Sequence, residues 1–444
     1  MHIKFNRLPQ AIKIKLKSLL VDNLLVISLK LNVPFLTAVA FKFAASRINR
    51  HGEYKVLVLG RSIFTDDIKA MAVFSGQINY TILHLKYLDA ILNHFIKQPE
   101  RARLAEDNYH IADIGAKGKL LVNAYLVRVM PFYKKLTGLQ AVVSANFGYI
   151  QQQELAKVCQ AQKIPFIIIH KEGMGAPSSR VSLYKNYHFI ADKILLYNNQ
   201  IKDFLSKVIV PGLTPDKMEI VGVPRLDFYF KKDKKDKASI DKKQLVFFAF
   251  HPDDKFVPLI HSQDNYQAAR LRTKDFFCLV MRFVAHHPEI NVIIKTKAAK
   301  HYLTYIQNIF SENFSAPIPN LTITHSGNPI DLIQNSDVVI GFHSTTLIEA
   351  LIAGKTIVSP YFEDVIDDQA GSHFKDYPTL INYAVKEDDL KSYIYNSGKN
   401  NNKDIQSLKE EFLRKWIFIP DGHASQRAEN AIIKTINELS IKGN

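Results

Sequence analysis

Short apolar runs alternate with helical patterns from residue 53 onward. Residues 53–60 (EYKVLVLG) form an apolar run ending in glycine, which is typical of a strand buried on both faces. Similar runs follow: QINYTILHL (77–85), LQAVVSANF (139–147), IPFIIIHKEGM (164–174), HFIADKILLYN (188–198) and MEIVGVPRLDFY (218–229). Strands separated by helical patterns predict a parallel sheet with right-handed crossovers.

A second pattern of this kind begins after a lysine-rich stretch. Residues 231–243 (KKDKKDKASIDKK) hold seven lysines, three aspartates and one large apolar residue, Ile240, and we predict an exposed linker there. Five more runs predict strands beyond it: QLVFFAFHP (244–252), NVIIKTK (291–297), LTITHSG (321–327), DVVIGF (337–342) and KTIVSPYF (355–362). The chain closes with a helical stretch, HASQRAENAIIKTINELSIK.

We therefore predict an α/β fold with two Rossmann-like parallel-sheet domains whose carboxyl edges face a cleft. A length of 444 residues with 47% hydrophobic residues is sufficient for two cores. The predicted parts are a basic helical segment (1–52), a first domain (53–230), the linker (231–243), a second domain (244–420) and a closing helix (421–444).

The net charge of +16 is concentrated at the start of the chain. Residues 1–50 carry nine Lys or Arg and one acid, Asp22, and AIKIKLKSLL resembles a basic amphipathic element. Such an element suits an anionic membrane surface, and the alternative is a solvated helix with lysines on its wet face. Lys30, Asn32 and Pro34 interrupt the apolar segments, so we expect no transmembrane helix or signal peptide there. No recognition motif points to nucleic acid.

The two cysteines, Cys159 and Cys278, are far apart and form no CxxC pair. The sequence therefore predicts neither a zinc site nor a disulfide framework, and we expect no metal.

Polar residues that follow the predicted strands are the candidates for chemistry, because ligands of parallel sheets bind at the carboxyl ends of the strands. In the first half these residues are Arg61, Ser62, Asn146, His170 and Glu172. In the second half they are His251, Lys295, Lys297, His325, Ser326, His343, Ser344, Thr345 and Thr346.

The second-half set favours phosphate binding. A helix that begins near Ser344 presents free N–H groups and a partial positive charge, to which hydroxyls and lysines would add. The chain contains no GxxxxGK[ST] motif, which disfavours a P-loop ATPase or kinase, and no GxGxxG follows the first strand. The alternative is structural: Thr346 and Glu349 fit a capping box, with Gly354 as the residue after the helix.

The first half offers candidates for a general base. His170 and Glu172 follow a strand of isoleucines, and Asp67 is a rival that could instead lie in the first turn of a helix.

Several motifs together resemble GT-B glycosyltransferases, and more closely those of bacterial surface-carbohydrate biosynthesis (capsule, O-antigen and teichoic-acid polymers). The motifs are VGVPRLDF (221–228), VFFAFHP, HPEINVIIKTK, SDVVIGFHSTTLIEALIAGK (336–355) and DGHASQRAENAI (421–432). The resemblance covers about 218–440 and is weak before 160. It implies a GT-B fold, a closing helix that returns to the first domain, a donor-binding second domain and an acceptor-binding first domain.

The resemblance also implies roles for single residues. Ser344, Thr345 and Thr346 would hold the phosphates of a nucleotide-sugar donor, Glu349 would lie near the ribose, and Lys295 or Lys297 would offset the charge of the departing nucleotide. Relatives that use cytidine-linked donors often carry His-Pro after the lysine. Thr296-Lys297 stands here instead, so a glycerol-phosphate donor is in doubt and the sugar stays open.

The leading hypothesis is a metal-independent glycosyltransferase that acts on a glycan or lipid-linked acceptor, without a cofactor, at the inner face of the cytoplasmic membrane. His170 would be its catalytic candidate, with Glu172 and Asp67 as alternatives, and Arg61, Ser62 and Asn146 would face the acceptor. A nucleotide-sugar 2-epimerase of the same fold and a non-catalytic assembly partner are the other hypotheses.

Overall fold

The computed structural model describes residues 10–49, 51–60, 64–110, 113–171, 181–231, 242–256, 263–342, 344–362, 373–397 and 403–441. The chain forms two compact units. Unit 1 comprises Met1–Asp227 and Lys415–Asn444, and unit 2 comprises Phe228–Arg414. The chain thus leaves unit 1 four residues before the predicted linker and re-enters it inside a helix, α17 (Lys403–Ile417).

Unit 1 is built on a seven-stranded sheet with the order β1-β3-β2-β4-β5-β6-β7. Its strands are β1 (Ser46–Arg47), β2 (Tyr54–Gly60), β3 (Ile78–His84), β4 (Ala141–Ser144), β5 (Phe166–Ile169), β6 (Lys193–Leu196) and β7 (Met218–Ile220). β1 pairs antiparallel with β3, and the pairings from β3 through β7 are parallel. All residues of β4 and β5 are buried, as expected for parallel strands covered on both faces.

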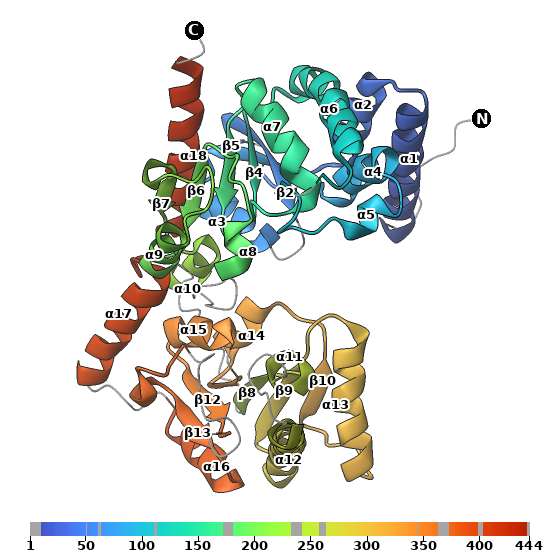
Figure 1. The fold of residues 1–444 in the computed structure, drawn as a ribbon. Helices are drawn as coiled ribbons and strands as arrows, with labels where there is room; N and C mark the ends of the chain where they lie inside the picture. The colour runs from blue at the N-terminus through green and yellow to red at the C-terminus, as the bar shows by residue number, and fades with distance from the viewer. Residues whose placement is uncertain are drawn as a thin grey trace. The chain divides into compact units, whose positions relative to one another are not determined.

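The helices of unit 1 lie on both faces of this sheet and at its ends. They are α1 (Gln10–Lys30), α2 (Pro34–Ala44), α3 (Thr65–Phe74), α4 (Lys86–Phe95), α5 (Glu100–Arg103), α6 (Ala116–Thr137), α7 (Gln153–Ala161), α8 (Val181–Lys185), α9 (Asn199–Val208) and α18 (Ala424–Ile441), with short 3-10 turns at Ile150–Gln152, Pro215–Lys217 and Pro224–Leu226. α18 runs along the β6 and β7 side of the sheet, and α1 and α2 lie at the opposite end (Figure 1).

The N-terminal helices pack into unit 1. α2 packs against α1 and α6, and a buried hydroxyl chain joins them: Thr37 lies 2.6 Å from both Ser28 and Tyr125. Over its described side chains, α1 buries Val21 and Leu25 on one side and exposes Leu19 and Ile27 on another. α1 therefore carries apolar side chains on two of its sides between Leu19 and Ile27. Most side chains of the basic stretch 11–17 lie outside the described ones, so the predicted amphipathic element stays a prediction.

Unit 2 is built on a six-stranded parallel sheet with the order β10-β9-β8-β11-β12-β13. Its strands are β8 (Lys243–Phe248), β9 (Ile290–Lys295), β10 (Leu321–Thr324), β11 (Val338–Ile340), β12 (Thr356–Pro360) and β13 (Asn382–Ala384). Its helices are α10 (Asp227–Lys231, which begins at the last residue of unit 1), α11 (Pro252–Phe256), α12 (Gln263–His286), α13 (Lys300–Asn313), α14 (Pro329–Asn335), α15 (Thr345–Ile352) and α16 (Glu387–Tyr395), with a 3-10 turn at Pro378–Leu380.

The α/β fold with two parallel-sheet domains is confirmed, and the differences from the predicted elements are local. The predicted strand 218–229 ends at Ile220, because Gly222 adopts a φ of 85° and Pro224 begins a 3-10 turn. Strands β1 and β13 have only two and three residues, too short to give an alternating or apolar pattern.

Asp227 fastens the closing helix to unit 1. Its buried carboxylate accepts hydrogen bonds from the backbone N–H groups of Ala424 at 3.2 Å and Ser425 at 2.7 Å, at the start of α18. A Cβ on Gly222 would come within 3.2 Å of Ala424 Cβ, so the backbone before Asp227 also approaches α18 closely. Further along α18, Glu429 accepts hydrogen bonds from the Tyr80 hydroxyl and the Gln77 N–H, both at 2.8 Å. Two acidic side chains thus hold α18 on unit 1.

We expect Asp227→Ala to destabilise the protein by about 2 kcal/mol, because two buried N–H groups at a helix start lose their acceptor. In a domain of this size that loss lowers the melting temperature by roughly 4–8 °C. Differential scanning calorimetry measures it. Asp66→Ala is the control, because Asp66 forms an exposed pair with Lys69 at 3.1 Å and its loss should change stability by less than about 1 kcal/mol. Equal effects of the two substitutions would contradict the role assigned to Asp227.

Candidate functional site

The strand order of unit 2 locates a switch point in its sheet. Counted from β8, the order is 3-2-1-4-5-6, and the direction of winding reverses between β8 and β11. Ligands of such sheets bind outside the carboxyl ends of the strands at this reversal. His251 follows β8, and Ser344 follows β11, so these two positions flank the expected binding site.

Helix α15 begins at this switch point. Ser344 is its N-cap, and the Ser344 Oγ accepts hydrogen bonds from the backbone N–H of Thr346 at 3.3 Å and from the Thr346 hydroxyl at 2.8 Å. The predicted capping box is wrong, because the N-cap is Ser344, two residues before Thr346, and the third helical residue is then Leu347 and not Glu349. Gly354 has a φ of 69° directly after the C-cap, as predicted for the residue that ends this helix.

Glu349 is buried, and one of its carboxylate oxygens accepts a hydrogen bond from the Tyr229 hydroxyl at 2.9 Å. This contact joins α15 to α10 within unit 2.

Lys297 is paired with a carboxylate. Its Nζ lies 2.9 Å from Asp254 and 3.3 Å from the Tyr302 hydroxyl, and that hydroxyl also donates to Asp254. Partial burial lowers the pKa of Lys297, but the hydrogen bonds with Asp254 and Tyr302 outweigh burial and leave the pKa above its ordinary value. The ammonium charge of Lys297 is thus already compensated.

Lys295 is held by neutral acceptors instead. Its Nζ donates to the carbonyl oxygens of Thr296 at 2.9 Å and His325 at 2.7 Å, and no carboxylate pairs with it in the described part of the chain. Burial lowers the pKa of Lys295. Its ammonium reaches toward the end of β10, where His325 and Ser326 are exposed.

His251 follows β8, the strand that lies between β9 and β11 in the sheet. Its ring is 4.5 Å from that of Tyr305, and its Nδ1 accepts a hydrogen bond from the Asp253 N–H at 3.3 Å. Burial lowers the pKa of His251, so the ring is neutral at pH 7. Adjacent strands are about 4.8 Å apart, so roughly 10 Å separates the ends of β9 and β11.

An aromatic layer lies beneath the ends of the central strands. Phe250 after β8, Phe342 after β11 and Phe362 after β12 are all buried. The Phe342 ring lies 5.0 Å from the Phe250 ring and 4.9 Å from the Phe362 ring. These rings are part of the core at the switch point, and their close packing limits movement of the polar residues beside them.

The corresponding edge of unit 1 is lined by buried polar side chains. Asn146, after β4, accepts a hydrogen bond from the Gly148 N–H at 2.7 Å through its side-chain oxygen. Gln152 also donates to the Asn146 carbonyl. Asn146 is buried, and its hydrogen bonds hold the loop in which it lies. These bonds are structural, whereas the sequence predicted that Asn146 would face the acceptor substrate.

His170 lies at the end of β5 in an aromatic cluster. It is buried, with its Nε2 3.3 Å from the Tyr184 hydroxyl and its ring 5.9 Å from that of Phe147. Tyr184, Tyr187 and Phe147 pack on one another with ring centroids 5.4 to 5.9 Å apart. The tyrosine hydroxyl orients the imidazole, as a base or proton donor requires.

Two further histidines lie near this edge of unit 1, and neither was among the residues predicted because they follow a strand. The rings of His110 and His188 are 4.9 Å apart, and His110 Nε2 lies 2.8 Å from Gln153 Oε1. Burial lowers the pKa of His110 to about 4, so this imidazole is neutral at pH 7. Neither residue directly follows a strand, which is why the sequence pattern did not single them out. The preceding residue, Tyr109, also contacts the core, because its hydroxyl donates to buried Glu154 at 2.9 Å.

Asp67 is committed to a buried network. Its carboxylate accepts hydrogen bonds from the Tyr197 hydroxyl at 2.8 Å and the Arg225 N–H at 3.1 Å, and the Arg225 guanidinium lies 3.4 Å away. Asp67 is 1% exposed. These contacts favour a structural role, in which Asp67 holds the residue 224–226 turn against α3.

Arg61, Ser62, Glu172 and His343 lie outside the described residues. Among the residues that are described, no group of three or more His, Cys, Asp or Glu side chains is arranged to hold a metal ion.

Comparisons with known proteins bear on the fold. No protein-family model matches the sequence, and no curated protein matches it. A structure from Listeria monocytogenes assigned as a UDP-N-acetylglucosamine 2-epimerase is 12% identical, with a TM-score of 0.51 over 87% of this chain and 98% of that one.

Two further structures match at lower scores. The UDP-GlcNAc 2-epimerase from Neisseria meningitidis, bound to UDP-GlcNAc, is 11% identical, with a TM-score of 0.47 over 86% of this chain and 100% of that one. The glycotransferase of kitacinnamycin is 10% identical, with a TM-score of 0.45 over 87% of this chain and 100% of that one. At these identities the likeness concerns the fold alone. With its two Rossmann-like parallel-sheet units, the chain has a GT-B-like fold.

Proposed function

We propose that the protein is a glycosyltransferase that moves a sugar from a nucleotide-sugar donor to a glycan or lipid-linked acceptor. The acceptor class we propose is that of bacterial surface polysaccharide, such as capsule or O-antigen, and the place is the inner face of the cytoplasmic membrane. The GT-B-like fold and the motifs around 221–228 and 336–355 support the transferase.

One observation carries the donor assignment: three consecutive hydroxyl residues, Ser344, Thr345 and Thr346, begin a helix at the switch point of a 3-2-1-4-5-6 sheet. That position is where such sheets bind phosphorylated ligands, and a helix start offers free N–H groups and a partial positive charge. The absence of the GxGxxG and GxxxxGK[ST] motifs from the sequence argues against the dinucleotide and P-loop alternatives.

The chemistry follows from charge. Breaking the bond between sugar and phosphate leaves negative charge on the departing nucleotide, and donors fixed in place stabilise it without reorganisation. The α15 N–H groups and the Thr345 hydroxyl would serve the phosphate, and Lys295 would supply a full charge. Lys295 suits this role better than Lys297, because Asp254 already neutralises Lys297. No step of this mechanism uses a metal or a cofactor.

The acceptor must lose a proton, and His170 is the base we propose. It ends a central strand of unit 1 and is oriented by the Tyr184 hydroxyl 3.3 Å away. Asp67 is less suited, since Arg225 and Tyr197 already bind its carboxylate. Glu172 stays an alternative, and the neutral imidazole of His110 is a further one.

We expect the protein to bind at least one nucleotide sugar from a panel of uridine-, cytidine-, guanosine- and thymidine-linked donors. Thermal stabilisation in differential scanning fluorimetry detects binding. Thr345→Val and Lys295→Ala should each weaken it roughly tenfold or more, because each removes a donor to a charged phosphate. Calorimetric titration of each variant measures the dissociation constant.

Thr322→Val is the matched control, because Thr322 is an exposed residue within β10 and not at a strand end. If Thr345→Val and Lys295→Ala bind the donor as tightly as Thr322→Val does, the phosphate assignment is wrong. Stabilisation by no nucleotide would favour a non-catalytic partner. Conversion of the donor to an epimer without any acceptor would show an epimerase instead of a transferase.

We expect His170→Gln to lower the rate of sugar transfer by about 100-fold or more while donor affinity stays within about twofold, since general-base catalysis contributes 10²–10⁴ in rate. Tyr184→Phe, which keeps the ring and removes the orienting hydroxyl, should lower the rate by a smaller factor. Transfer by His170→Gln at the wild-type rate would exclude His170 as the base. Circular dichroism checks that both variants are folded.

A further inference from the structure

A cationic pocket lies in unit 1 at the amino ends of the strands. It has a volume of about 300 Å³, and its wall includes Lys42 from α2, Arg47 from β1 and Lys55 from β2. Lys55 is the second residue of its strand, whereas the predicted acceptor residues follow the carboxyl ends. The pocket is therefore at the opposite end of the strands from the candidate site of unit 1.

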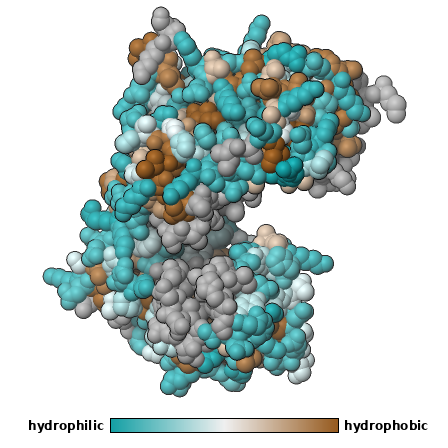
Figure 2. Space-filling model, in the orientation of Figure 1, coloured by the Kyte–Doolittle hydropathy of each residue, from teal (hydrophilic) through white to brown (hydrophobic). Residues whose placement is uncertain are grey.

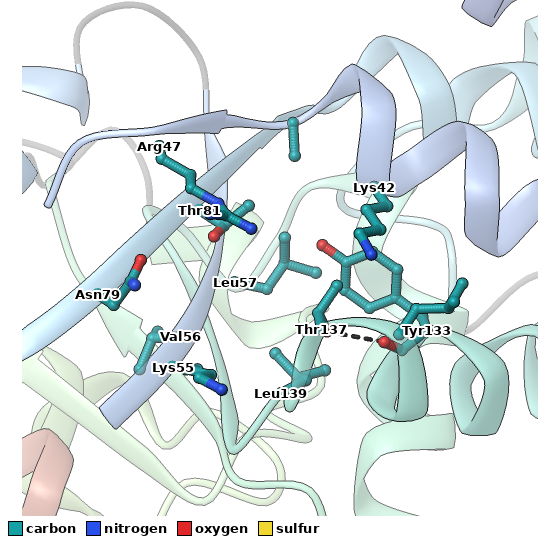
Figure 3. A pocket seen from close by; sticks show the side chains of 12 residues that line it. Lys42, Arg47, Lys55, Val56, Leu57, Asn79, Thr81, Tyr133, Thr137 and Leu139 are labelled. Carbon is teal, nitrogen blue, oxygen red and sulfur yellow. Dashed lines mark hydrogen bonds between the residues drawn. The ribbon is translucent and has the colours of Figure 1, made fainter. Parts of the chain in front are cut away.

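The wall of this pocket contains cations and hydrogen-bond donors but no acid. Besides the three cations it includes Asn79, Thr81, Tyr133, Thr137 and apolar residues (Figure 3). None of the three cations pairs with a carboxylate among the described residues. All three residues are exposed, so water screens their mutual repulsion, and an anion bound between them would remove what repulsion is left.

Tyr133 adds a buried donor to this wall. The residue is 1% exposed, and in Figure 3 its hydroxyl points toward Leu57, another wall residue. Burial raises the pKa of Tyr133, while the charge of Arg47 acts in the opposite direction. The phenol is therefore protonated at pH 7 and can donate a hydrogen bond to an anion.

Exposed aromatic residues adjoin the cationic wall. Phe43 follows Lys42 and is 57% exposed, and Phe132 precedes Tyr133 and is 42% exposed. The Phe132 ring packs edge-on against that of Phe35 at 5.6 Å. Large apolar side chains at a surface next to several cations are typical of proteins that bind the headgroup region of a membrane.

The apolar exposure continues over α1. Leu19, Leu20, Val26 and Ile27 are each about half exposed or more, and their spacing of one and seven residues places them on one side of the helix. Hydrophobic side chains are visible at the surface around these helices, among hydrophilic ones (Figure 2). We call this surface, together with Phe35, Phe43 and Phe132, the apolar face. None of the helices in the described part of the chain is long and apolar enough to cross a membrane.

We propose that the pocket of Lys42, Arg47 and Lys55 binds the phosphate of an anionic membrane lipid while the apolar face enters the headgroup region around it. A phosphate accepts several donors at once, and an arginine fork with two ammonium groups and a phenol matches that geometry. The inference deepens the membrane location proposed above, on which it rests, and adds a lipid site away from the proposed transfer chemistry.

We expect Lys42→Gln/Arg47→Gln to weaken binding of the full-length protein to vesicles of phosphatidylglycerol and phosphatidylcholine by roughly tenfold or more in co-sedimentation. Lys202→Gln/Lys207→Gln, on α9, removes the same charge from another part of unit 1 and should change binding by less than about threefold. Equal loss in the two double variants would overturn the pocket, because it would show attraction by net charge alone.

Two further variants test the chemistry of the site. Tyr133→Phe should weaken binding to these vesicles several-fold, and Phe43→Ser should do so through the apolar face. Unchanged binding by Tyr133→Phe would overturn the headgroup contact.

Free glycerol phosphate should bind at least tenfold more weakly than vesicles. If it binds as well as vesicles and Phe43→Ser has no effect, the site serves a soluble phosphate and the lipid assignment is wrong. Nucleotide-sugar binding by these variants is measured in parallel and should not change, so failure of the lipid site is separable from failure of the proposed transferase.

Discussion

The path of the chain depends on the buried carboxylate of Asp227. This side chain accepts two backbone N–H groups at the start of α18, a helix that begins 197 residues later in the sequence. Asn198 adds a second tie, because its amide donates to the Trp416 carbonyl at 2.7 Å where the chain re-enters unit 1. A buried charge is costly without partners, so the Asp227 carboxylate needs the N–H groups of α18. The start of α18 in turn needs an acceptor for those N–H groups. In sequence, the whole of unit 2 is therefore an insertion between two segments that unit 1 requires.

The same junction accounts for the polar residues of the motif around residues 221–228. Arg225 pairs with Asp67, Asp227 holds α18, and Gly222 lets the backbone pass within contact of Ala424. The polar residues of this motif are thus used for unit 1. In unit 2, by contrast, Ser344 and Thr346 bond only to each other and to their own helix start in the contacts the structure gives them, which leaves that end of the sheet suited to a ligand.

The sequence was sufficient to predict the two sheets, because buried parallel strands such as β5 are continuous apolar runs that short-range patterns reveal. It also predicted which residues follow the strands, since that depends only on chain order. It could not predict strand neighbours, so the switch point between β8 and β11, and the spacing of roughly 10 Å between the ends of β9 and β11, came only from the sheet order. Nor could it distinguish a free acid from one such as Asp67, whose partners lie 130 and 158 residues away.

The two ends of the strands in unit 1 differ in chemistry. The carboxyl end gathers imidazoles, tyrosines and buried amides, and burial lowers the pKa of one of these imidazoles, His110, to about 4. The amino end gathers Lys42, Arg47 and Lys55 without an acid in the pocket wall. A neutral imidazole has a nitrogen free to accept a proton, and a cationic edge favours a standing anion. Placing them at opposite ends of one rigid sheet keeps the attracting charges from altering the protonation of the residues at the other end.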